Sequence, residues 1–211
     1  MAGAEKIKGI YVIVDNSIFP ERSHLEIVQR ALEGGARIIQ LRAKELLKRE
    51  VWRIARVMKR LCERYDAIFI VNDYVDIALD VGADGVHLGA DDMPINEARE
   101  KAPELIIGRS THSLEEAIEA EKLGADYIAF GAIFPTQTKG RPTPIQGLDK
   151  LKEVCEKVKK PVVAIGGINR GNLIEVKQAG ADAVAMISEV VKAEDIKQRV
   201  KELIQLWEKT D

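Results

Sequence analysis

Short runs of apolar, largely β-branched residues alternate along this chain with longer segments in which apolar residues recur every three to four positions. Short runs of this kind are typical of buried parallel strands, and the longer segments are typical of amphipathic helices. The alternation continues from one end of the chain to the other, which indicates repeated β/α units. Eight strands are expected, at residues 10–14, 37–41, 68–71, 85–88, 105–107, 127–130, 162–165 and 183–187.

Segments with helical periodicity are expected at residues 24–33, 45–64, 114–123, 148–158, 172–179 and 194–207. A glycine-alanine sequence recurs just before every second strand, at residues 35–36, 82–84, 124–126 and 180–182, and the last three copies add an aspartate. Glycine at these positions can adopt the left-handed backbone of a helix C-terminus. The recurrence therefore indicates that one turn is repeated through the fold.

Eight strands in a chain of 211 residues predict an α/β fold, a single-domain (β/α)8 TIM barrel with short loops. A doubly wound open sheet is the competing architecture, but it usually carries a glycine-rich loop after its first strand. Here Asp15, Asn16 and Ser17 follow the first strand, so the closed barrel is favoured. In such a barrel the functional residues gather at the C-terminal ends of the strands.

Charge and composition narrow the classes of partner. The 32 Lys and Arg residues nearly balance the 34 Asp and Glu residues, so the basic field of nucleic-acid-binding proteins is absent. The first residues lack the apolar core of a signal peptide and no apolar run is long enough for a membrane span, so a cytoplasmic protein is expected. Cys62 and Cys155 lack metal-binding or redox spacing and are expected to be reduced structural thiols. Small molecules are the expected partners, and homo-oligomer formation stays open.

Polar residues follow the second strand, in the sequence Gln40, Leu41, Arg42, Ala43, Lys44. Alternation along a strand places Gln40, Arg42 and Lys44 on one side, towards the mouth of the barrel. Two cations and an amide at that position suit a polyanionic substrate. The alternative is that Arg42 and Lys44 only cap the barrel rim.

Acidic residues follow the third and fourth strands. Asn72 and Asp73 end one strand, and Asp91 and Asp92 follow the next. Carboxylates at neighbouring strand ends can share Mg2+, which typically takes one or two protein carboxylates together with phosphate oxygens. Asp73 and Asp92 are therefore the predicted metal ligands, while Asp91 is interpreted as a cap for the helix that follows Pro94.

Hydroxyl and imidazole groups follow the fifth strand. Ser110 or His112 is expected to face the mouth, and Ser113 is expected to cap the next helix. His112 fits a hydrogen-bonded structural role as well as a catalytic one.

Glycines and a serine follow the last two strands, as Gly166 and Gly167 after the seventh and Ile187 and Ser188 after the eighth. Residues of these types form the phosphate site of many barrels, because bare backbone N–H groups can surround a phosphoryl group. Phosphate binding is therefore predicted at this side of the mouth.

The loop after the sixth strand, residues 130–144, carries Thr136, Thr138 and Lys139 close together. Two threonines two residues apart can project to the same side of an extended segment, beside the lysine. The loop is interpreted as an anion-binding segment, with an ordinary polar loop as the alternative.

Together these motifs resemble the thiamine phosphate synthase family. Q-L-R-A-K, V-N-D, G-V-H-L-G-A-D-D, S-T-H, F-G-A-I-F-P-T-Q-T-K, A-I-G-G-I and the final I-S occur in the family's order and span nearly the whole chain. The resemblance implies a Mg2+-dependent transferase on a (β/α)8 barrel. Enzymes of that family condense 4-amino-2-methyl-5-hydroxymethylpyrimidine pyrophosphate with 4-methyl-5-(2-hydroxyethyl)thiazole phosphate. The products are thiamine phosphate and pyrophosphate.

The resemblance also implies roles, carried over motif by motif. The pyrimidine pyrophosphate would be held by Gln40, Arg42, Lys44, Asn72, Ser110 and Lys139, with Arg42, Lys44, Lys139 and Ser110 as the catalytic set. Its Mg2+ would be bound by Asp73 and Asp92, and the thiazole phosphate by Thr136, Gln137, Thr138, Gly167, Ile187 and Ser188. Ala43 stands where the family commonly has glutamate, and Ala90 where many members have glutamine.

The chemistry implied by the resemblance agrees with the residue types. Loss of pyrophosphate from the pyrimidine leaves a stabilised carbocation, so catalysis would consist mainly of neutralising the departing charge. No protein nucleophile is needed, in agreement with the lack of a recognisable nucleophile–base motif. Two alternatives stay open, namely a thiazole phosphate tautomerase on the same barrel, which would use His112, and a non-catalytic binder of phosphorylated metabolites.

Overall fold

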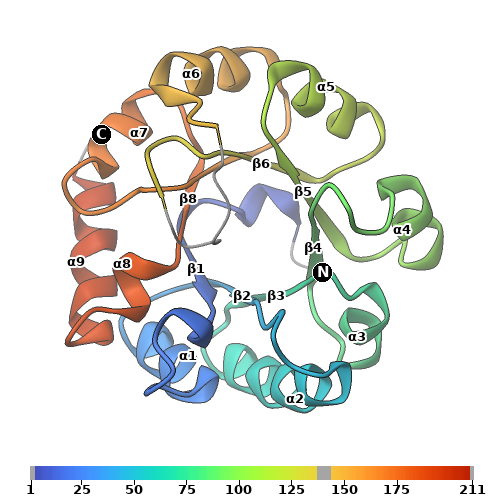
Figure 1. Ribbon diagram of the computed structural model, residues 1–211, viewed down its shortest axis with the longest axis vertical. Helices are drawn as coiled ribbons and strands as arrows, with labels where there is room; N and C mark the ends of the chain where they lie inside the picture. Colours follow the sequence, from blue (N-terminus) through green and yellow to red (C-terminus); the bar gives the residue numbers. More distant parts are fainter. Residues whose placement is uncertain (1–2, 137–143, 210–211) are drawn as a thin grey trace.

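The strands form a closed parallel barrel in which each strand pairs with its neighbours in the sequence and the last pairs with the first (Figure 1). The structure is a computed structural model that describes residues 3–136 and 144–209. The strands are β1 (Gly9–Val14), β2 (Ile38–Leu41), β3 (Ile68–Asn72), β4 (Gly85–Leu88), β5 (Ile106–Thr111), β6 (Tyr127–Gly131), β7 (Val162–Ile165) and β8 (Ala183–Met186). The predicted (β/α)8 barrel is confirmed.

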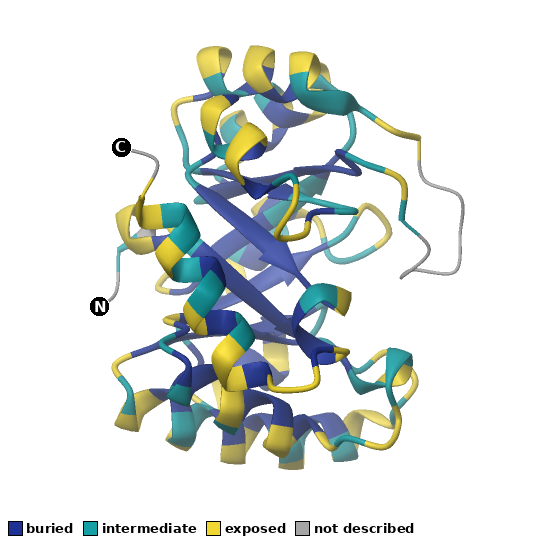
Figure 2. Ribbon diagram, turned by 90° about the vertical axis from the view of Figure 1, so that its left-hand side faces the viewer, coloured by how far each residue is buried: buried dark blue, intermediate teal, exposed yellow. Residues whose placement is uncertain are grey.

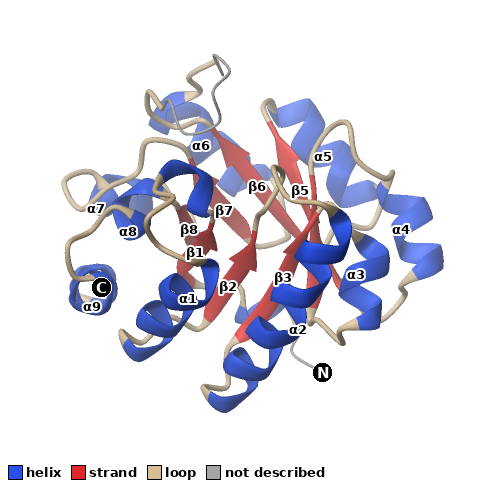
Figure 3. Ribbon diagram, turned by 60° about the horizontal axis from the view of Figure 1, so that its bottom comes forward, coloured by secondary structure: helices blue, strands red, loops and turns tan. Residues whose placement is uncertain are grey.

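Helices surround the barrel on its outer side (Figure 3). They are α1 (His24–Glu33), α2 (Lys48–Arg64), α3 (Val75–Asp80), α4 (Ile95–Lys101), α5 (Leu114–Lys122), α6 (Gly147–Lys157), α7 (Leu173–Gln178), α8 (Ser188–Val191) and α9 (Ile196–Glu208). Two 3₁₀ helices, η1 (Ala4–Lys6) and η2 (Asn16–Ile18), flank β1. The six helical segments predicted from periodicity are all present, whereas α3 and α8 were not predicted because they are too short to show a clear period.

The core lies on both faces of the strands, as Figure 2 shows by the buried strands and the exposed outer faces of the helices. The helix α2 illustrates why: its buried residues Val51, Ala55, Met58 and Cys62 recur every three to four positions. That spacing places them on one stripe facing the barrel. Among the described residues, none of the helices combines the length and the apolar character that crossing a membrane would require.

The repeated glycine-alanine-aspartate sequence has one structural role at all three sites. Its glycines have φ angles of 67°, 96° and 100° at residues 82, 124 and 180, as a left-handed helix end requires. Each aspartate carboxylate accepts a hydrogen bond from a backbone N–H of the preceding strand, from Phe69 to Asp84 at 2.8 Å, Ile107 to Asp126 at 2.9 Å and Val162 to Asp182 at 2.9 Å. The repeat therefore joins neighbouring strands at the end of the barrel where they begin.

The strand β5 is longer than predicted. Ladder pairing with β6 continues through Arg109, Ser110 and Thr111, which the sequence analysis placed in a loop. Their polar side chains broke the apolar pattern that was used to end the strand. Because β5 continues, Ser110 is held by a strand rather than by a mobile connection.

Both cysteines carry free thiols, as predicted. Burial raises the pKa of Cys62 and of Cys155 to about 12, so neither forms a thiolate at neutral pH. Neither thiol is suited to act as a nucleophile.

Candidate active site

Two adjoining cavities open at the C-terminal ends of the strands. The first, here the charged cavity, is lined by Ile13, Gln40, Arg42, Lys44, Asn72, Asp73, His87, Gly89, Ser110, Ile165 and Ile187. The second, here the glycine cavity, is lined by Ser110, Thr111, His112, Ala129, Gly131, Ala132, Thr136, Ile165, Gly166, Gly167, Ile168, Ala185, Met186, Ile187 and Ser188. Both contain Ser110, Ile165 and Ile187, so these three residues mark the place where the cavities meet.

Arg42 is anchored in the charged cavity by Asp15, a residue without a role in the sequence analysis. The two side chains form an ion pair in which the carboxylate is almost completely buried. Asp15 also accepts hydrogen bonds from Ser17, from its backbone N–H at 3.0 Å and its hydroxyl at 2.6 Å. The aspartate is therefore fixed by the turn after β1 and holds the guanidinium at the cavity wall. The signal in the sequence was an acidic residue directly after a predicted strand.

Lys44 pairs with Asp73 across the same cavity, with 3.0 Å between Nζ and Oδ2. Asp73 has a φ angle of 68°, a left-handed conformation that is uncommon for a residue other than glycine. Such strain at the end of a strand is typical of functional positions. Both cations predicted from the Q-L-R-A-K sequence thus line the cavity beside a carboxylate, rather than only capping the rim.

Asp73 and Asp92 lie side by side. Burial and a hydrogen bond with Asp92 raise the pKa of Asp73 to about 6. Burial acts to raise the pKa of Asp92 as well, but hydrogen bonds from Asp73 and from the Gly89 N–H hold it below its usual value. Two carboxylates that share a proton form a place where a cation can replace that proton.

The donor set fits Mg2+ only as a partial site. Within residues 3–136 and 144–209, no group of three or more His, Cys, Asp or Glu side chains could hold a metal ion. Mg2+ usually takes only one or two protein carboxylates and completes its octahedron with phosphate oxygens and water. The pair Asp73 and Asp92 meets that requirement when a phosphorylated substrate supplies the remaining ligands.

The prediction that Asp91 caps the helix after Pro94 is wrong. The helix α4 begins after Pro94 without any side-chain cap. Asp92 instead accepts a hydrogen bond from the Gly89 backbone N–H at 2.6 Å and so closes its own loop. Pro94 occupies the cap position of α4 and offers no side-chain acceptor. The loop before it is closed by Asp92 rather than by Asp91.

Two residues of the Q-L-R-A-K sequence lie outside the cavity. Leu41 is buried in the core, and Ala43 packs against the core. Gln40 and Asn72 are buried and line the charged cavity, as alternation along the strands predicted.

Backbone shape, more than side-chain charge, forms the glycine cavity. Gly166 and Gly167 have φ angles of 101° and 67°. A Cβ atom on Gly167 would lie 2.6 Å from the Pro135 carbonyl oxygen and 2.7 Å from Phe134 Cβ, so only glycine fits. Ser188 is the first residue of α8 at the cavity wall.

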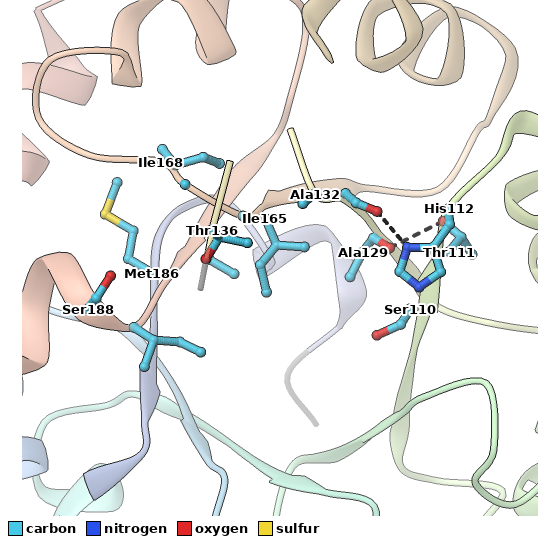
Figure 4. A pocket seen from close by; sticks show the side chains of 15 residues that line it. Ser110, Thr111, His112, Ala129, Ala132, Thr136, Ile165, Ile168, Met186 and Ser188 are labelled. Atoms are coloured by element: carbon cyan, nitrogen blue, oxygen red, sulfur yellow. Dashed lines mark hydrogen bonds between the residues drawn. The ribbon is translucent and has the colours of Figure 1, made fainter. Parts of the chain in front are cut away.

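Figure 4 shows Thr136, Met186 and Ser188 on one side of the glycine cavity, Ser110 and His112 on the other, and Ile165 between them. His112 Nδ1 donates to the Gly131 carbonyl oxygen at 2.5 Å, which fixes the ring. Ser113 caps α5 as predicted, by accepting from the Glu116 N–H at 3.1 Å. Gln137, Thr138 and Lys139 lie outside the described residues.

Ile18 and Phe19, in the connection after β1, are half-buried and pack against the core. Ile18 also lines a further hollow beside Thr136 and Ser188.

A buried chain of hydrogen bonds crosses the barrel beneath the charged cavity. Gln40 Nε2 donates to the Tyr11 hydroxyl at 2.8 Å, and the hydroxyls of Tyr11 and Tyr127 are 2.9 Å apart. The Tyr127 hydroxyl is 2.9 Å from His87 Nδ1, and His87 Nε2 is 2.9 Å from the Ser110 hydroxyl. No role was predicted for the two tyrosines or for His87. Polar atoms within otherwise apolar strands were the signal that could have identified them.

Comparisons with known proteins agree with these features. Residues 10–190 match the family model described as thiamine monophosphate synthase. A thiamine-phosphate synthase of Pyrococcus furiosus is 51% identical to this chain over 94% of each sequence. A thiamine-phosphate synthase of Pyrococcus abyssi is 49% identical over 99% of this chain and 98% of its own length.

Solved structures also include a close match to a protein of this family. The thiamine phosphate pyrophosphorylase of Pyrococcus furiosus superposes with a TM-score of 0.90 at 48% identity and covers 98% of both chains. A 3-hexulose-6-phosphate synthase superposes with a TM-score of 0.71 at 21% identity, over 94% of this chain and 99% of its own. The second similarity shows that the fold is shared with enzymes of other reactions.

Proposed function

Because the chain belongs to the thiamine monophosphate synthase family and is a transferase that forms thiamine phosphate, we propose that its two cavities divide the two substrates between them. The charged cavity takes the pyrimidine pyrophosphate and the glycine cavity takes the thiazole phosphate. The observation that carries this proposal is the contrast between the linings. One has two paired cations and the carboxylate of Asp73, and the other has glycines together with small and apolar residues.

Arg42 and Lys44 neutralise the pyrophosphate as it leaves. Each already faces a carboxylate, Asp15 for Arg42 and Asp73 for Lys44, so each is held in place before the substrate arrives. Preorganised charges of this kind stabilise a transition state because they need little reorganisation when the bond breaks. The proposal adds Lys139, which lies outside the described residues, to the same set.

Asp73 and Asp92 hold the magnesium ion in this proposal. Mg2+ bound there would add positive charge next to the departing pyrophosphate. Asn72, buried at the end of β3, contributes an amide to the same wall. When no cation is bound, the two carboxylates share a proton only below about pH 6, because burial and the neighbouring Asp92 raise the pKa of Asp73 to about 6.

The glycine cavity binds by shape. Gly167 leaves its backbone open to a phosphate group, and Thr136 and Ser188 supply hydroxyls at the wall. Gln137 and Thr138, outside the described residues, belong to the same group by family motif. The thiazole nitrogen would then face the junction with the charged cavity.

The reaction takes place where the cavities meet, beside Ser110, Ile165 and Ile187. Departure of pyrophosphate leaves a pyrimidine carbocation, which the thiazole nitrogen attacks. The apolar side chains of the two isoleucines favour exclusion of water, which would otherwise capture the cation. Positioning of both substrates supplies much of the remaining rate acceleration.

The test measures thiamine phosphate and pyrophosphate with each substrate alone and with both, in Mg2+ and in EDTA. We expect rapid release of pyrophosphate only with both substrates and Mg2+. Full activity in EDTA would contradict the role of the metal, while absence of product under every condition would contradict the function itself.

A further inference from the structure

The buried hydrogen-bond chain that links Gln40 to Ser110 contains five polar side chains. They are joined by four hydrogen bonds, each between 2.8 and 2.9 Å. Its middle members are among the most buried side chains of the protein, with Tyr11 at 1% exposed and Tyr127 fully buried. Gly108 makes room for this arrangement, because a Cβ atom there would lie 2.0 Å from the Tyr127 ring. The fold therefore gives up a side chain in the barrel interior to admit the tyrosine.

The direction of these hydrogen bonds follows from counting protons. Burial raises the pKa of both tyrosines, so each phenol keeps its single proton. Gln40 donates to Tyr11, and the proton of Tyr11 is then directed to the Tyr127 oxygen. Tyr127 in turn directs its own proton to His87 Nδ1.

The imidazole must therefore carry its proton on Nε2 and donate it to the Ser110 oxygen. The opposite direction would leave the proton of Tyr11 or of Tyr127 without an acceptor in the chain, in surroundings where an unsatisfied polar group is costly. The side-chain oxygens of Tyr11 and Tyr127 are not among the buried atoms without a partner in the described parts of the chain.

We propose that Tyr11, Tyr127 and His87 are positioning residues that orient the Ser110 hydroxyl as a hydrogen-bond donor to the pyrimidine substrate. Since the Ser110 oxygen accepts from His87, its own proton is directed to the junction of the two cavities. The group that it recognises is an acceptor, a ring nitrogen or a phosphate oxygen, rather than an amino group. This inference rests on the proposed function only for the identity of that ligand.

The first test needs no substrate. Nitrogen-15 NMR of the full chain with labelled histidine reports which ring nitrogen of His87 carries the proton, and loss of one set of signals in His87→Gln assigns the residue. We expect the proton on Nε2 and an unprotonated, hydrogen-bonded Nδ1. A proton on Nδ1 with Nε2 unprotonated would overturn the proposal, because Ser110 would then donate to His87 and offer only lone pairs to the substrate.

The second test removes one hydroxyl. Tyr127→Phe should remove the hydrogen bond to His87 Nδ1 and so give a mixture of the two imidazole tautomers. It should also lower kcat/KM for the pyrimidine pyrophosphate about tenfold, the effect of one lost hydrogen bond. KM for the thiazole phosphate should stay unchanged. The matched control is Tyr65→Phe, whose hydroxyl accepts from Gln29 at 3.2 Å far from both cavities, and which should alter neither quantity.

An unchanged ring form together with unchanged kinetics in Tyr127→Phe would also overturn the proposal. If wild-type protein made no thiamine phosphate, the proposed function would fail. The NMR result would still decide whether the hydrogen bonds are donated in the direction from Gln40 to Ser110.

Discussion

The two cavities differ in how the chain builds them. The charged cavity depends on side chains, and its cations are held by carboxylates that are themselves fixed, as Asp15 is by Ser17. The glycine cavity depends on backbone, and Gly167 could not carry even one additional carbon atom. Preorganised charge is suited to a transition state, whereas a fitted shape is suited to a ground state. The difference suggests that one cavity carries the chemistry and the other supplies affinity.

Arg42→Ala should have the largest effect. We expect kcat to fall by about 10²–10³, the range typical for loss of one preorganised electrostatic contact. The change also leaves the buried Asp15 unpaired, which should lower the free energy of unfolding by roughly 3 kcal/mol. Steady-state kinetics and denaturant unfolding measure the two quantities. Arg170→Ala is the control, because its pair with Glu202 is largely exposed and neither value should change much.

Asp92→Ala should weaken Mg2+ binding at least tenfold, since it removes one of only two protein carboxylates. Isothermal titration of Mg2+ in the presence of pyrophosphate measures the affinity. The adjacent Asp91→Ala is the control, because Asp91 makes none of the contacts that Asp92 makes with Gly89 and Asp73. Equal losses in the two variants would remove Asp92 from the metal site.

Gly167→Ala should raise KM for the thiazole phosphate about tenfold and leave kcat at saturation nearly unchanged. The added Cβ meets Pro135 and Phe134, and alanine is strained at a φ of 67°, so the backbone must shift away from its binding position. Steady-state kinetics with the thiazole phosphate as the varied substrate measure both constants. A fall in kcat comparable to that of Arg42→Ala would show that the glycine cavity also takes part in the chemistry.

The smallest effect concerns pH. The pKa of Asp73 is raised from 3.8 to about 6, so the folded protein holds this proton more tightly than the unfolded chain does. Its contribution to stability is therefore fully present below about pH 4 and is lost as the pH rises through about 6. Asp73→Asn cannot titrate, so its unfolding free energy in EDTA should fall less over this range than that of the wild type. Parallel profiles of the two proteins would contradict the shift.

The sequence was sufficient for those parts of the fold that follow a local pattern. Each strand was recognised from its apolar run, and Arg42, Lys44 and Asp73 were placed at the mouth because polar residues closely follow such runs. In a parallel barrel, position after a strand is nearly the same thing as position at the mouth. The predicted end of β5 was too early, because polar residues continue the strand where the apolar pattern stops, although Ser110 lies at the mouth as expected.

Long-range pairings could not be predicted in this way. Tyr11 and Tyr127 are 116 positions apart in sequence, and nothing near either one indicates that their hydroxyls meet. Their contact exists only when β1 and β6 face each other across a closed barrel. The partnership of Asp15 with Arg42 likewise depends on the pairing of β1 with β2, which brings the two strand ends together.

A single-turnover comparison of Arg42→Ala and Gly167→Ala tests the division between the cavities most directly. Enzyme in excess over the pyrimidine pyrophosphate is mixed with saturating thiazole phosphate and Mg2+, and the rate of pyrophosphate formation is followed. We expect this rate to fall by about 10²–10³ in Arg42→Ala and to stay close to the wild-type value in Gly167→Ala. Equal slowing in the two variants would contradict that division.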